Sequence, residues 1–280
     1  MATILDTLKK GTEYLQKYQV DEARLNMEHL IAHVLKVDRM QLYLDFDRPL
    51  DEVELVSLRD LTKRRSRGEP LQHLLGTVEF FDNEFKTDAR ALIPRPETEE
   101  LTSILAGKNW PDGVSILDMG CGSGVIGLSL AAALTEKSPS LLLADVSPDA
   151  LALAWENSDL LGTSATFVES DLFSAVDGQF DLIVANLPYI PNAEETNLSR
   201  EVQRDPSLAL YGGELGTEVI ERFLEKAPDF LKPSGAIALE FGIGQASQLR
   251  LIAGKAGFSD VEIRSDLSGI ERFLFSSISG

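Results

Sequence analysis

The sequence has little cysteine and little histidine. Its 280 residues include one cysteine, Cys121, and 3 histidines. A single cysteine excludes an intrachain disulfide and a cysteine-rich metal site, and it agrees with a reducing compartment. His29 and His33 lie one helical turn apart, but no third ligand is near them in the sequence. We therefore expect no metal site in this protein.

Long apolar runs are also missing. No stretch approaches the ~20 apolar residues that a helix needs to cross a bilayer. The first segment is interrupted by Asp6, Lys9 and Lys10, which argues against a signal peptide. We expect a cytoplasmic protein without a membrane partner.

Basic residues are few compared with acidic ones. The chain has 26 Lys and Arg against 45 Asp and Glu, and nearly all of the formal net charge of -19 lies beyond residue 72. Such a surface repels a phosphate backbone, so no direct nucleic-acid partner is expected. The basic run at residues 63–67 is better explained as the solvated end of a helix.

Two kinds of periodicity divide the chain. From Ile4 to about Arg67 apolar residues recur at helical spacing, which predicts a small helical bundle in residues 1–72. Strand-like residues on either side of Asp82 and Asn83 predict a β-hairpin in a linker of residues 73–90. Residues 91–280 alternate between strand and helix patterns, which predicts an α/β fold with a doubly wound, mainly parallel sheet.

Seven strands are expected in this larger domain. They fall at residues 115–118, 141–145, 165–168, 180–185, 236–240, 261–263 and 272–275, with helices beginning at Val125, Asp149 and Gln245. In doubly wound sheets ligands bind at the carboxyl ends of the strands. Each motif described next follows such an end.

A glycine-rich segment, residues 118–124, follows the first strand. Its glycines let a ligand approach the backbone and expose N–H groups at a helix start. Asp145 ends the next strand, where an acid can bind a ribose diol. Residues 122–127 match the dinucleotide fingerprint, so a nicotinamide cofactor is an alternative. Asp118 would repel a pyrophosphate but could indirectly hold the ammonium of a methionine-like group, so we favour S-adenosylmethionine.

The turn Asn186-Leu187-Pro188-Tyr189 follows the fourth strand. An amino group next to a carbonyl or an aromatic ring is a weak nucleophile, so an enzyme must hold both of its hydrogens. The Asn186 side-chain oxygen and the Leu187 carbonyl could be the two acceptors. Pro188 would restrict Leu187, and Tyr189 could offer a flat face to the planar group. The alternative is a strand that simply ends in an Asn-x-Pro turn.

Two further residues have more than one interpretation. Asp171 follows the third strand and could bind the adenine amino group, or it could cap a helix or sit in a loop. Cys121 has no identified histidine partner, so we interpret it as a small filler of the glycine loop and not as a nucleophile.

Together these segments resemble the HemK/PrmC family of S-adenosylmethionine-dependent methyltransferases, which modify the glutamine of the Gly-Gly-Gln motif in peptide-chain release factors. The resemblance covers essentially the whole chain. Its most specific part is Leu92-Ile93-Pro94-Arg95-Pro96-Glu97-Thr98-Glu99 combined with the Asn186 turn. Further matches are residues 67–72, Phe80, Phe81, Phe85, residues 170–173, Glu201, Val202, Ala209, Leu210, Gly212, Gly213, Glu240, Gly242, Gln245, Asp266, Leu267, Gly269 and Arg272.

The resemblance implies a class I, Rossmann-like methyltransferase domain with a seven-stranded sheet in residues 91–280. It also implies that the N-terminal bundle binds the release factor and that S-adenosylhomocysteine is the product. The expected acceptor-binding, catalytic residues are Asn186, Leu187, Pro188 and Tyr189. The expected cofactor-binding residues, from motif and resemblance together, are Asp118, Gly120, Cys121, Gly122, Ser123, Gly124, Asp145, Asp171, Leu172 and Asn186. The long segment 191–211 would form a lid.

The sequence departs from the family pattern in two places. Leu187 stands where the family usually has a proline, which removes some stiffness from the turn, on the order of 0.4 to 1 kcal/mol. It also makes the turn similar to that of ribosomal RNA adenine dimethyltransferases, so an adenine-amino methyltransferase acting on RNA or DNA is the alternative. An acid expected after Gly213 falls at Leu215, beside Glu214, and neither receives a role. A non-catalytic adaptor is disfavoured by the intact glycine loop and Asp145.

Overall fold

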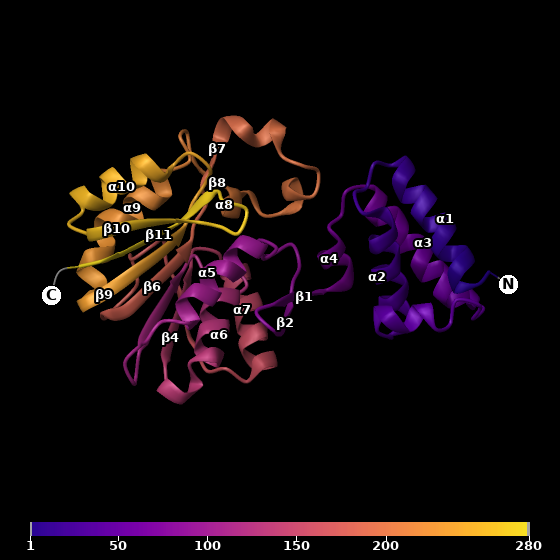
Figure 1. Cartoon of the computed structure of the whole chain (residues 1–280), viewed down its shortest axis with the longest axis horizontal. Helices are drawn as coiled ribbons and strands as arrows, with labels where there is room; N and C mark the ends of the chain where they lie inside the picture. The colour runs from indigo at the N-terminus through magenta and orange to yellow at the C-terminus, as the bar shows by residue number, and fades with distance from the viewer. Residues whose placement is uncertain (1, 279–280) are drawn as a thin grey trace. The chain divides into compact units, whose positions relative to one another are not determined.

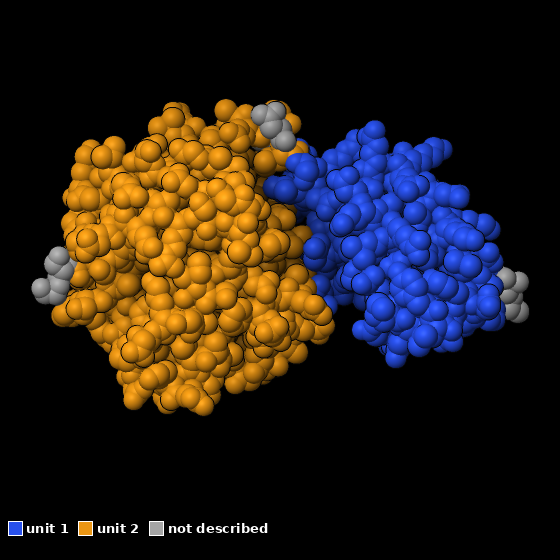
Figure 2. Space-filling view, in the orientation of Figure 1, with its two compact units in different colours: residues 1–77, 199–204 blue, residues 78–198, 205–280 orange. Residues whose placement is uncertain are grey.

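The computed structural model describes residues 2–278, which form two compact units (Figure 2). The first unit comprises the residues up to Thr77 together with Ser199–Arg204. The second comprises Val78–Leu198 together with the residues from Asp205 onward. The sequence predicted domain boundaries after residues 72 and 90, and these stay a prediction. The two compact units divide the chain differently, because the hairpin belongs to the second unit and residues 199–204 of the long loop belong to the first.

The first unit is a helical bundle. Capping boxes begin three of its helices, at Thr3 with Asp6, at Asp38 with Gln41 and at Asp51 with Glu54, and each cap contributes about 1 kcal/mol. Its core consists of Ile4, Leu8, Leu15, Ala23, Met27, Leu30, Ile31, Ala32, Leu42, Leu50, Leu58 and Leu74. The elements are α1 (Ile4–Lys17), α2 (Ala23–Leu35), the 3-10 helix η1 (Arg39–Tyr43), α3 (Glu52–Ser66), α4 (Leu71–Leu75) and a further 3-10 helix at Val202–Arg204.

A buried carboxylate ties α2 to η1 in this bundle. Glu28 is 3% exposed. It accepts hydrogen bonds from Arg24 at 2.9 Å, Arg39 at 2.9 Å and the Tyr43 hydroxyl at 2.7 Å. Because a buried charge must be paired, these three donors are what makes the carboxylate tolerable at this position.

A buried guanidinium holds the loop segment Ser199–Arg204 in the first unit. Arg65 is 3% exposed. It donates to the Asn26 side chain at 2.6 Å and to the Glu69 carbonyl at 3.1 Å. Its remaining nitrogen forms an ion pair with Glu201. The pairing explains why this part of the long loop belongs to the bundle.

The second unit contains the remaining elements (Figure 1). Its helices are α5 (Pro96–Ala106), α6 (Val125–Ala133), α7 (Pro148–Leu161), α8 (Ser207–Leu210), α9 (Glu218–Lys226) and α10 (Ala246–Lys255), with short 3-10 helices at Thr135–Lys137, Asn192–Asn197 and Ala227–Phe230. Its strands are β1 (Thr77–Phe80), β2 (Asn83–Lys86), β3 (Ser115–Met119), β4 (Ser140–Asp145), β5 (Thr166–Glu169), β6 (Phe180–Asn186), β7 (Ile190–Pro191), β8 (Tyr211–Gly213), β9 (Leu231–Glu240), β10 (Ser259–Ser265) and β11 (Glu271–Ser277). Within residues 2–278, no helix is both long and apolar enough to cross a bilayer.

A seven-stranded sheet forms the centre of this unit. The strand order is β10-β11-β9-β6-β3-β4-β5, and all neighbours are parallel except those that involve β11. The expected strands and the doubly wound, mainly parallel sheet are therefore confirmed. After β5 the chain returns to the other side of β3 to form β6. This reversal makes the carboxyl ends of β3 and β6 the topological switch point, where such folds bind ligands.

The two faces of the sheet are covered by different helices, α5, α6 and α7 on one and α9 and α10 on the other (Figure 1). Alternating residues of β6 divide between the two apolar layers. Leu182 and Val184 pack in the cluster that contains α6, and Ile183 and Ala185 in the one that contains α9 and α10. The near-continuous apolar run of β6 follows from this double coverage.

The hairpin turn lies one residue earlier than the sequence indicated. Phe81 and Asp82 are the turn residues, with φ of 49° and 58°, and Asn83 already begins β2. Two successive residues with positive φ match the right-handed twist of hairpin strands. The Asn83 side chain supports the turn by donating to the Phe81 carbonyl at 2.7 Å. Phe80 and Phe85 are 2% and 0% exposed and join the apolar layer of the second unit.

Candidate active site

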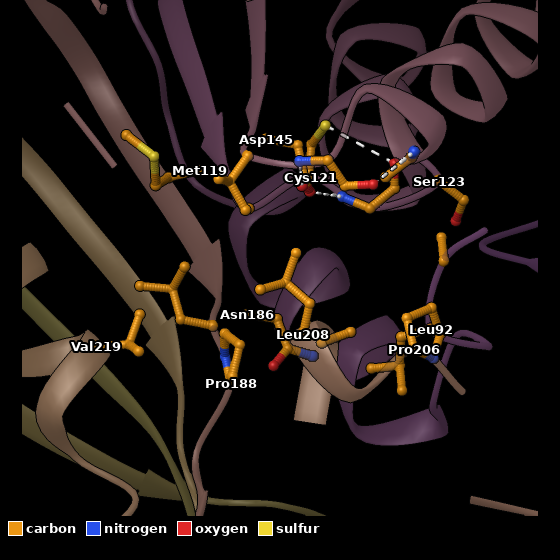
Figure 3. A pocket seen from close by; sticks show the side chains of 18 of the residues that line it. Leu92, Met119, Cys121, Ser123, Asp145, Asn186, Pro188, Pro206, Leu208 and Val219 are labelled. Atoms are coloured by element: carbon orange, nitrogen blue, oxygen red, sulfur yellow. Dashed lines mark hydrogen bonds between the residues drawn. The ribbon is translucent and has the colours of Figure 1, made fainter. Parts of the chain in front are cut away.

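A cavity of about 380 Å³ opens at the carboxyl ends of β3, β4 and β6 in the second unit. Its volume lies in the ordinary range for small-molecule sites. Figure 3 shows Asn186 and Pro188 across the cavity from Cys121 and Ser123 of the glycine loop. The expected site residues that line it are Gly120, Cys121, Gly122, Ser123, Asp145, Asp171, Leu172, Asn186, Leu187 and Pro188. The expected site residues that do not line it are Asp118, Gly124 and Tyr189.

The glycine loop turns closely around the end of β4. The N–H groups of Gly120 and Cys121 both donate to the Ala144 carbonyl, at 2.8 and 3.0 Å. Gly120 has a φ of 67°, and a Cβ at this position would lie 2.8 Å from Cδ2 of Leu187. Only glycine therefore allows both the left-handed backbone and the close approach of the Asn186 turn.

Asp145 combines a structural role in this loop with unused hydrogen-bonding capacity. One carboxylate oxygen accepts from the Gly122 N–H at 2.8 Å and the other from the Ser147 N–H at 2.8 Å. Burial raises the pKa of Asp145, and these backbone donors oppose the rise. A carboxylate has about four acceptor sites, so each oxygen can still accept a bond from a ribose hydroxyl. The position on the cavity wall fits that role.

Asp118 lies behind the loop and not on the cavity wall. It is 0% exposed. One oxygen accepts from the Gly127 N–H at 2.8 Å, and the other has no partner among the described residues. Burial raises the pKa of Asp118 to about 7, opposed by the bond from Gly127 and assisted by the charge of Asp145. Its expected contribution to holding an ammonium group is thus an indirect one and stays a prediction.

Cys121 is a buried, neutral thiol. It is 6% exposed, and burial raises its pKa well above the usual value, with Asp118 and Asp145 adding to the shift. A nucleophilic cysteine needs a lowered pKa, so this environment does not favour nucleophilic chemistry.

Asp171 and Leu172 form the wall beyond β5. Asp171 makes an ion pair with Arg222 at 2.7 Å, and both side chains are more than half exposed. Leu172 has a φ of 49° and is 9% exposed. The ion pair leaves acceptor sites on the Asp171 carboxylate, so its role toward an adenine amino group stays a prediction.

The turn after β6 is held by several contacts. The Asn186 Nδ2 donates to the Thr98 hydroxyl at 3.0 Å, and the Thr98 hydroxyl donates to Glu240 at 2.7 Å. The Tyr189 carbonyl accepts from Nε2 of Gln245 at 2.9 Å. In the described part of the chain, neither Oδ1 of Asn186 nor the Leu187 carbonyl accepts a hydrogen bond. Two acceptors are thus free on residues that line the cavity.

Tyr189 was expected to offer its ring to the acceptor, but it does not line the cavity. Its hydroxyl donates to Glu240 at 3.3 Å, and its ring lies 3.1 Å from where a Cβ on Gly242 would be. Burial is the main reason that its pKa is raised, and the neighbouring charge of Glu240 adds to it. Since Tyr189 does not line the cavity, its use as a flat face for the acceptor stays a prediction.

Thr98, Glu240 and Gln245 were matched to the family pattern but received no role from the sequence. The structure brings them together at the Asn186 turn. The sequence did contain one signal for Glu240, which is an acid at the end of an apolar strand. Asp145 ends its strand in the same way, and Asp118 is the last residue but one of its strand. The long loop also contributes, since Pro206, Leu208 and Ala209 line the cavity.

Two family models match the chain. One is described as the PrmC N-terminal domain and matches residues 6–76, and the other as the methyltransferase small domain and matches residues 98–216. The chain is 39% identical over 274 residues to a release factor glutamine methyltransferase of Geobacter sulfurreducens, across 97% of this chain and 95% of that protein. It is 38% identical over 286 residues to a protein of the same description from Chlorobaculum tepidum, across 97% and 96%.

The fold is similar to that of a solved methyltransferase from Pyrococcus furiosus. The TM-score is 0.54 at 20% identity, across 70% of this chain and 89% of that one. At this identity the likeness concerns the fold alone, and it agrees with the class I methyltransferase architecture of the second unit.

Proposed function

The chain belongs to the family of release factor glutamine methyltransferases, and we propose from this premise that it methylates a glutamine side-chain nitrogen in peptide-chain release factors. The acceptor would be the glutamine of the Gly-Gly-Gln motif. The observation that carries the proposal is a cavity with two free acceptors, Oδ1 of Asn186 and the carbonyl of Leu187, next to a glycine loop.

The residues present fit S-adenosylmethionine as the methyl donor. Asp145 retains acceptor sites for a ribose diol, and the buried Asp118 carboxyl behind the loop has one oxygen without a partner among the described residues. Gly120 to Gly124, Asp171 and Leu172 would hold the rest of the molecule. When bound, the donor supplies a methyl carbon made electrophilic by the sulfonium and leaves as S-adenosylhomocysteine. No metal is part of the proposed reaction.

The protein's task is to position a weak nucleophile. Asn186 Oδ1 and the Leu187 carbonyl would each accept one hydrogen of the glutamine amide, which aims the nitrogen at the methyl carbon in line with the leaving sulfur. The proton would be lost after transfer to solvent or to an acceptor oxygen, so no general base is needed beforehand. Positioning of this kind can contribute roughly 7 to 11 kcal/mol in favourable systems.

The long loop would exclude water from this reaction. Pro206, Leu208 and Ala209 line the cavity with apolar surface, and Figure 3 shows the first two of them. A dry site strengthens the bonds from the two acceptor oxygens to the amide. This supports the expectation that residues 191–211 act as a lid.

The helical bundle would bind the release factor, and nucleic acid would not be a direct partner. The family model for residues 6–76 supports the first part, and the net charge of -19 supports the second. The cytoplasm, where release factors act, is the location that follows from this substrate. An adenine-amino methyltransferase is not favoured, because the relatives at 38% and 39% identity are described as acting on release factors.

The proposal is tested by incubating the protein with radiolabelled S-adenosylmethionine and, separately, a release factor, ribosomal RNA and DNA. We expect label on the release factor alone, and loss of that label when its motif glutamine is changed to asparagine. Label on RNA or DNA without label on the release factor would overturn the proposal.

A further inference from the structure

We propose that Glu240, acting through Thr98, is a positioning residue that orients the Asn186 carboxamide so that its oxygen faces the acceptor. This inference rests on the proposed function, because it concerns how that same site selects an amide nitrogen. It assigns a role to two residues that lie outside the glycine loop and the Asn186 turn.

The three side chains form one hydrogen-bonded chain across three elements. Asn186 ends β6 and Glu240 ends β9, and the two are direct partners in the parallel register of the sheet. Thr98 lies in the first turn of α5 and bridges them, at 3.0 Å from Asn186 and 2.7 Å from Glu240. Thr98 is 3% exposed and Glu240 is 2% exposed, so water does not replace these bonds.

The direction of the bonds follows from the number of protons. Thr98 has a single hydroxyl proton, and it donates this proton to Oε2 of Glu240. The Thr98 oxygen can then only accept from Asn186. Of the two ends of the Asn186 carboxamide, the NH₂ end alone can meet that requirement. Through two successive hydrogen bonds, the Glu240 acceptor oxygen therefore decides which end of the Asn186 carboxamide is turned away from the cavity.

The consequence is selection of nitrogen over oxygen in the acceptor. With its NH₂ held by Thr98, Asn186 offers Oδ1 as an acceptor for a substrate N–H. With the carboxamide reversed, Asn186 would instead donate to the substrate carbonyl, and the glutamine nitrogen would be turned away from the donor. An amide bound in that reversed way does not react, so the orientation of Asn186 affects turnover more than binding.

The same carboxylate also holds the far end of the turn. Its second oxygen accepts from the Tyr189 hydroxyl at 3.3 Å. Burial raises the pKa of Glu240, and the bonds from Thr98 and Tyr189 oppose the rise, as does the charge of Arg272. One carboxylate thus holds Asn186 and Tyr189 on either side of Leu187. A glutamine at position 240 has one acceptor oxygen and could satisfy only one of the two hydroxyls.

The test uses Thr98→Val and Thr98→Ser in the full-length protein. Valine is nearly isosteric with threonine but cannot donate or accept, whereas serine keeps the hydroxyl. We expect Thr98→Val to lower kcat with a release factor by about 10 to 100-fold, the loss typical of a misplaced reacting group. The Kd for S-adenosylmethionine, measured by calorimetry, stays within about twofold of wild type, because the loop and Asp145 are untouched. Thr98→Ser retains most of the activity.

The matched control is Thr102→Val. Thr102 is also buried, lies one turn further along α5, and donates only to the Thr98 carbonyl. This variant loses a buried hydroxyl from the same helix without touching Asn186, and we expect kcat close to that of wild type. An equal loss in Thr102→Val would show that general packing of α5 is responsible, and it would overturn the proposal.

Other outcomes separate the inference from the proposed function. If wild type methylates the release factor and Thr98→Val turns over normally, the inference is wrong while the function stands. If wild type does not methylate any release factor, the proposed function itself fails. If Thr98→Val does not fold, Glu240→Leu carries the test, because leucine offers Thr98 no acceptor. A lowered kcat with unchanged cofactor affinity then supports the inference, and a normal kcat overturns it.

Discussion

Gly120 of the glycine loop leaves no room for a side chain beside Leu187 of the acceptor turn, and Gly120→Ala tests the importance of this packing. An added Cβ would meet Cδ2 of Leu187 at 2.8 Å, and the residue has a φ of 67°. A non-glycine residue in this backbone region costs about 1 to 2 kcal/mol. Leu187 is 4% exposed and packs in the core, so it must also leave its rotamer, which costs about 0.5 to 1.5 kcal/mol. We expect a total loss of about 1.5 to 3.5 kcal/mol.

Gly113→Ala is the matched control for backbone strain. Gly113 has a φ of 72°, and a Cβ there would meet nothing within 4 Å. This variant should lose about 1 to 2 kcal/mol from strain alone. The difference between the two variants measures the contact with Leu187. Because Leu187 supplies the proposed carbonyl acceptor, we expect Gly120→Ala alone to lower methyl transfer.

The assay is urea unfolding followed by tryptophan fluorescence, combined with methyl transfer to a release factor. Both tryptophans, Trp110 and Trp155, lie in the second unit, so the signal reports the unit that contains the site. The double variant Gly120→Ala/Leu187→Ala removes the clash but keeps the strain. Its loss should be smaller than the sum of the two single losses by about 0.5 to 1.5 kcal/mol. Strictly additive losses, or equal losses in Gly120→Ala and Gly113→Ala, would refute the reasoning.

Three further predictions concern single side chains. Asn186→Ala should lower kcat by about 100-fold or more while S-adenosylmethionine still binds, since it removes one of two proposed acceptors; near-normal turnover would contradict this. Asp145→Ala should raise the Kd for S-adenosylmethionine by about 10 to 100-fold in calorimetry, because charge-assisted bonds of about 1.5 to 3 kcal/mol are lost; an unchanged Kd would reject the ribose assignment. Burial by itself would raise the pKa of Glu28, but hydrogen bonds from Tyr43, Arg24 and Arg39 lower it overall. Its contribution to stability is therefore present above the ordinary glutamate pKa of about 4.3 and is lost as the pH falls through the lowered value. Hydrogen exchange of α2 should show this loss in wild type and a flatter pH profile in Glu28→Gln.

Much of the larger unit was predictable because its signals are local. The alternation of strand and helix patterns indicated all seven strands, and the glycine loop and the Asn186 turn were placed at the right strand ends. The hairpin was also predicted, with its turn displaced by one residue because Phe81 tolerates a positive φ there. A local pattern cannot reveal which bulky residue accepts that strain.

The contacts that complete the site were not predictable in this way. Thr98 and Glu240 are 142 residues apart, and Asn186 and Thr98 are 88 apart, so their meeting depends on the order of strands in the sheet and on the packing of α5. Tyr189 has the right residue type for the cavity wall, yet its hydroxyl bonds to Glu240 instead. The burial of Asp118 was not predictable from the sequence either, because it depends on how α6 packs on β3.

The sequence by itself determined the strands, the doubly wound sheet and the two motifs at its carboxyl edge, because hydrophobic period and turn chemistry act between near neighbours in the chain. The tertiary structure alone decided which acceptor oxygens stay free, which carboxylates are buried, and that Ser199–Arg204 packs with Arg65 of the bundle. These features depend on where remote segments meet, and a hydrogen bond can be assigned only when both of its partners have a place.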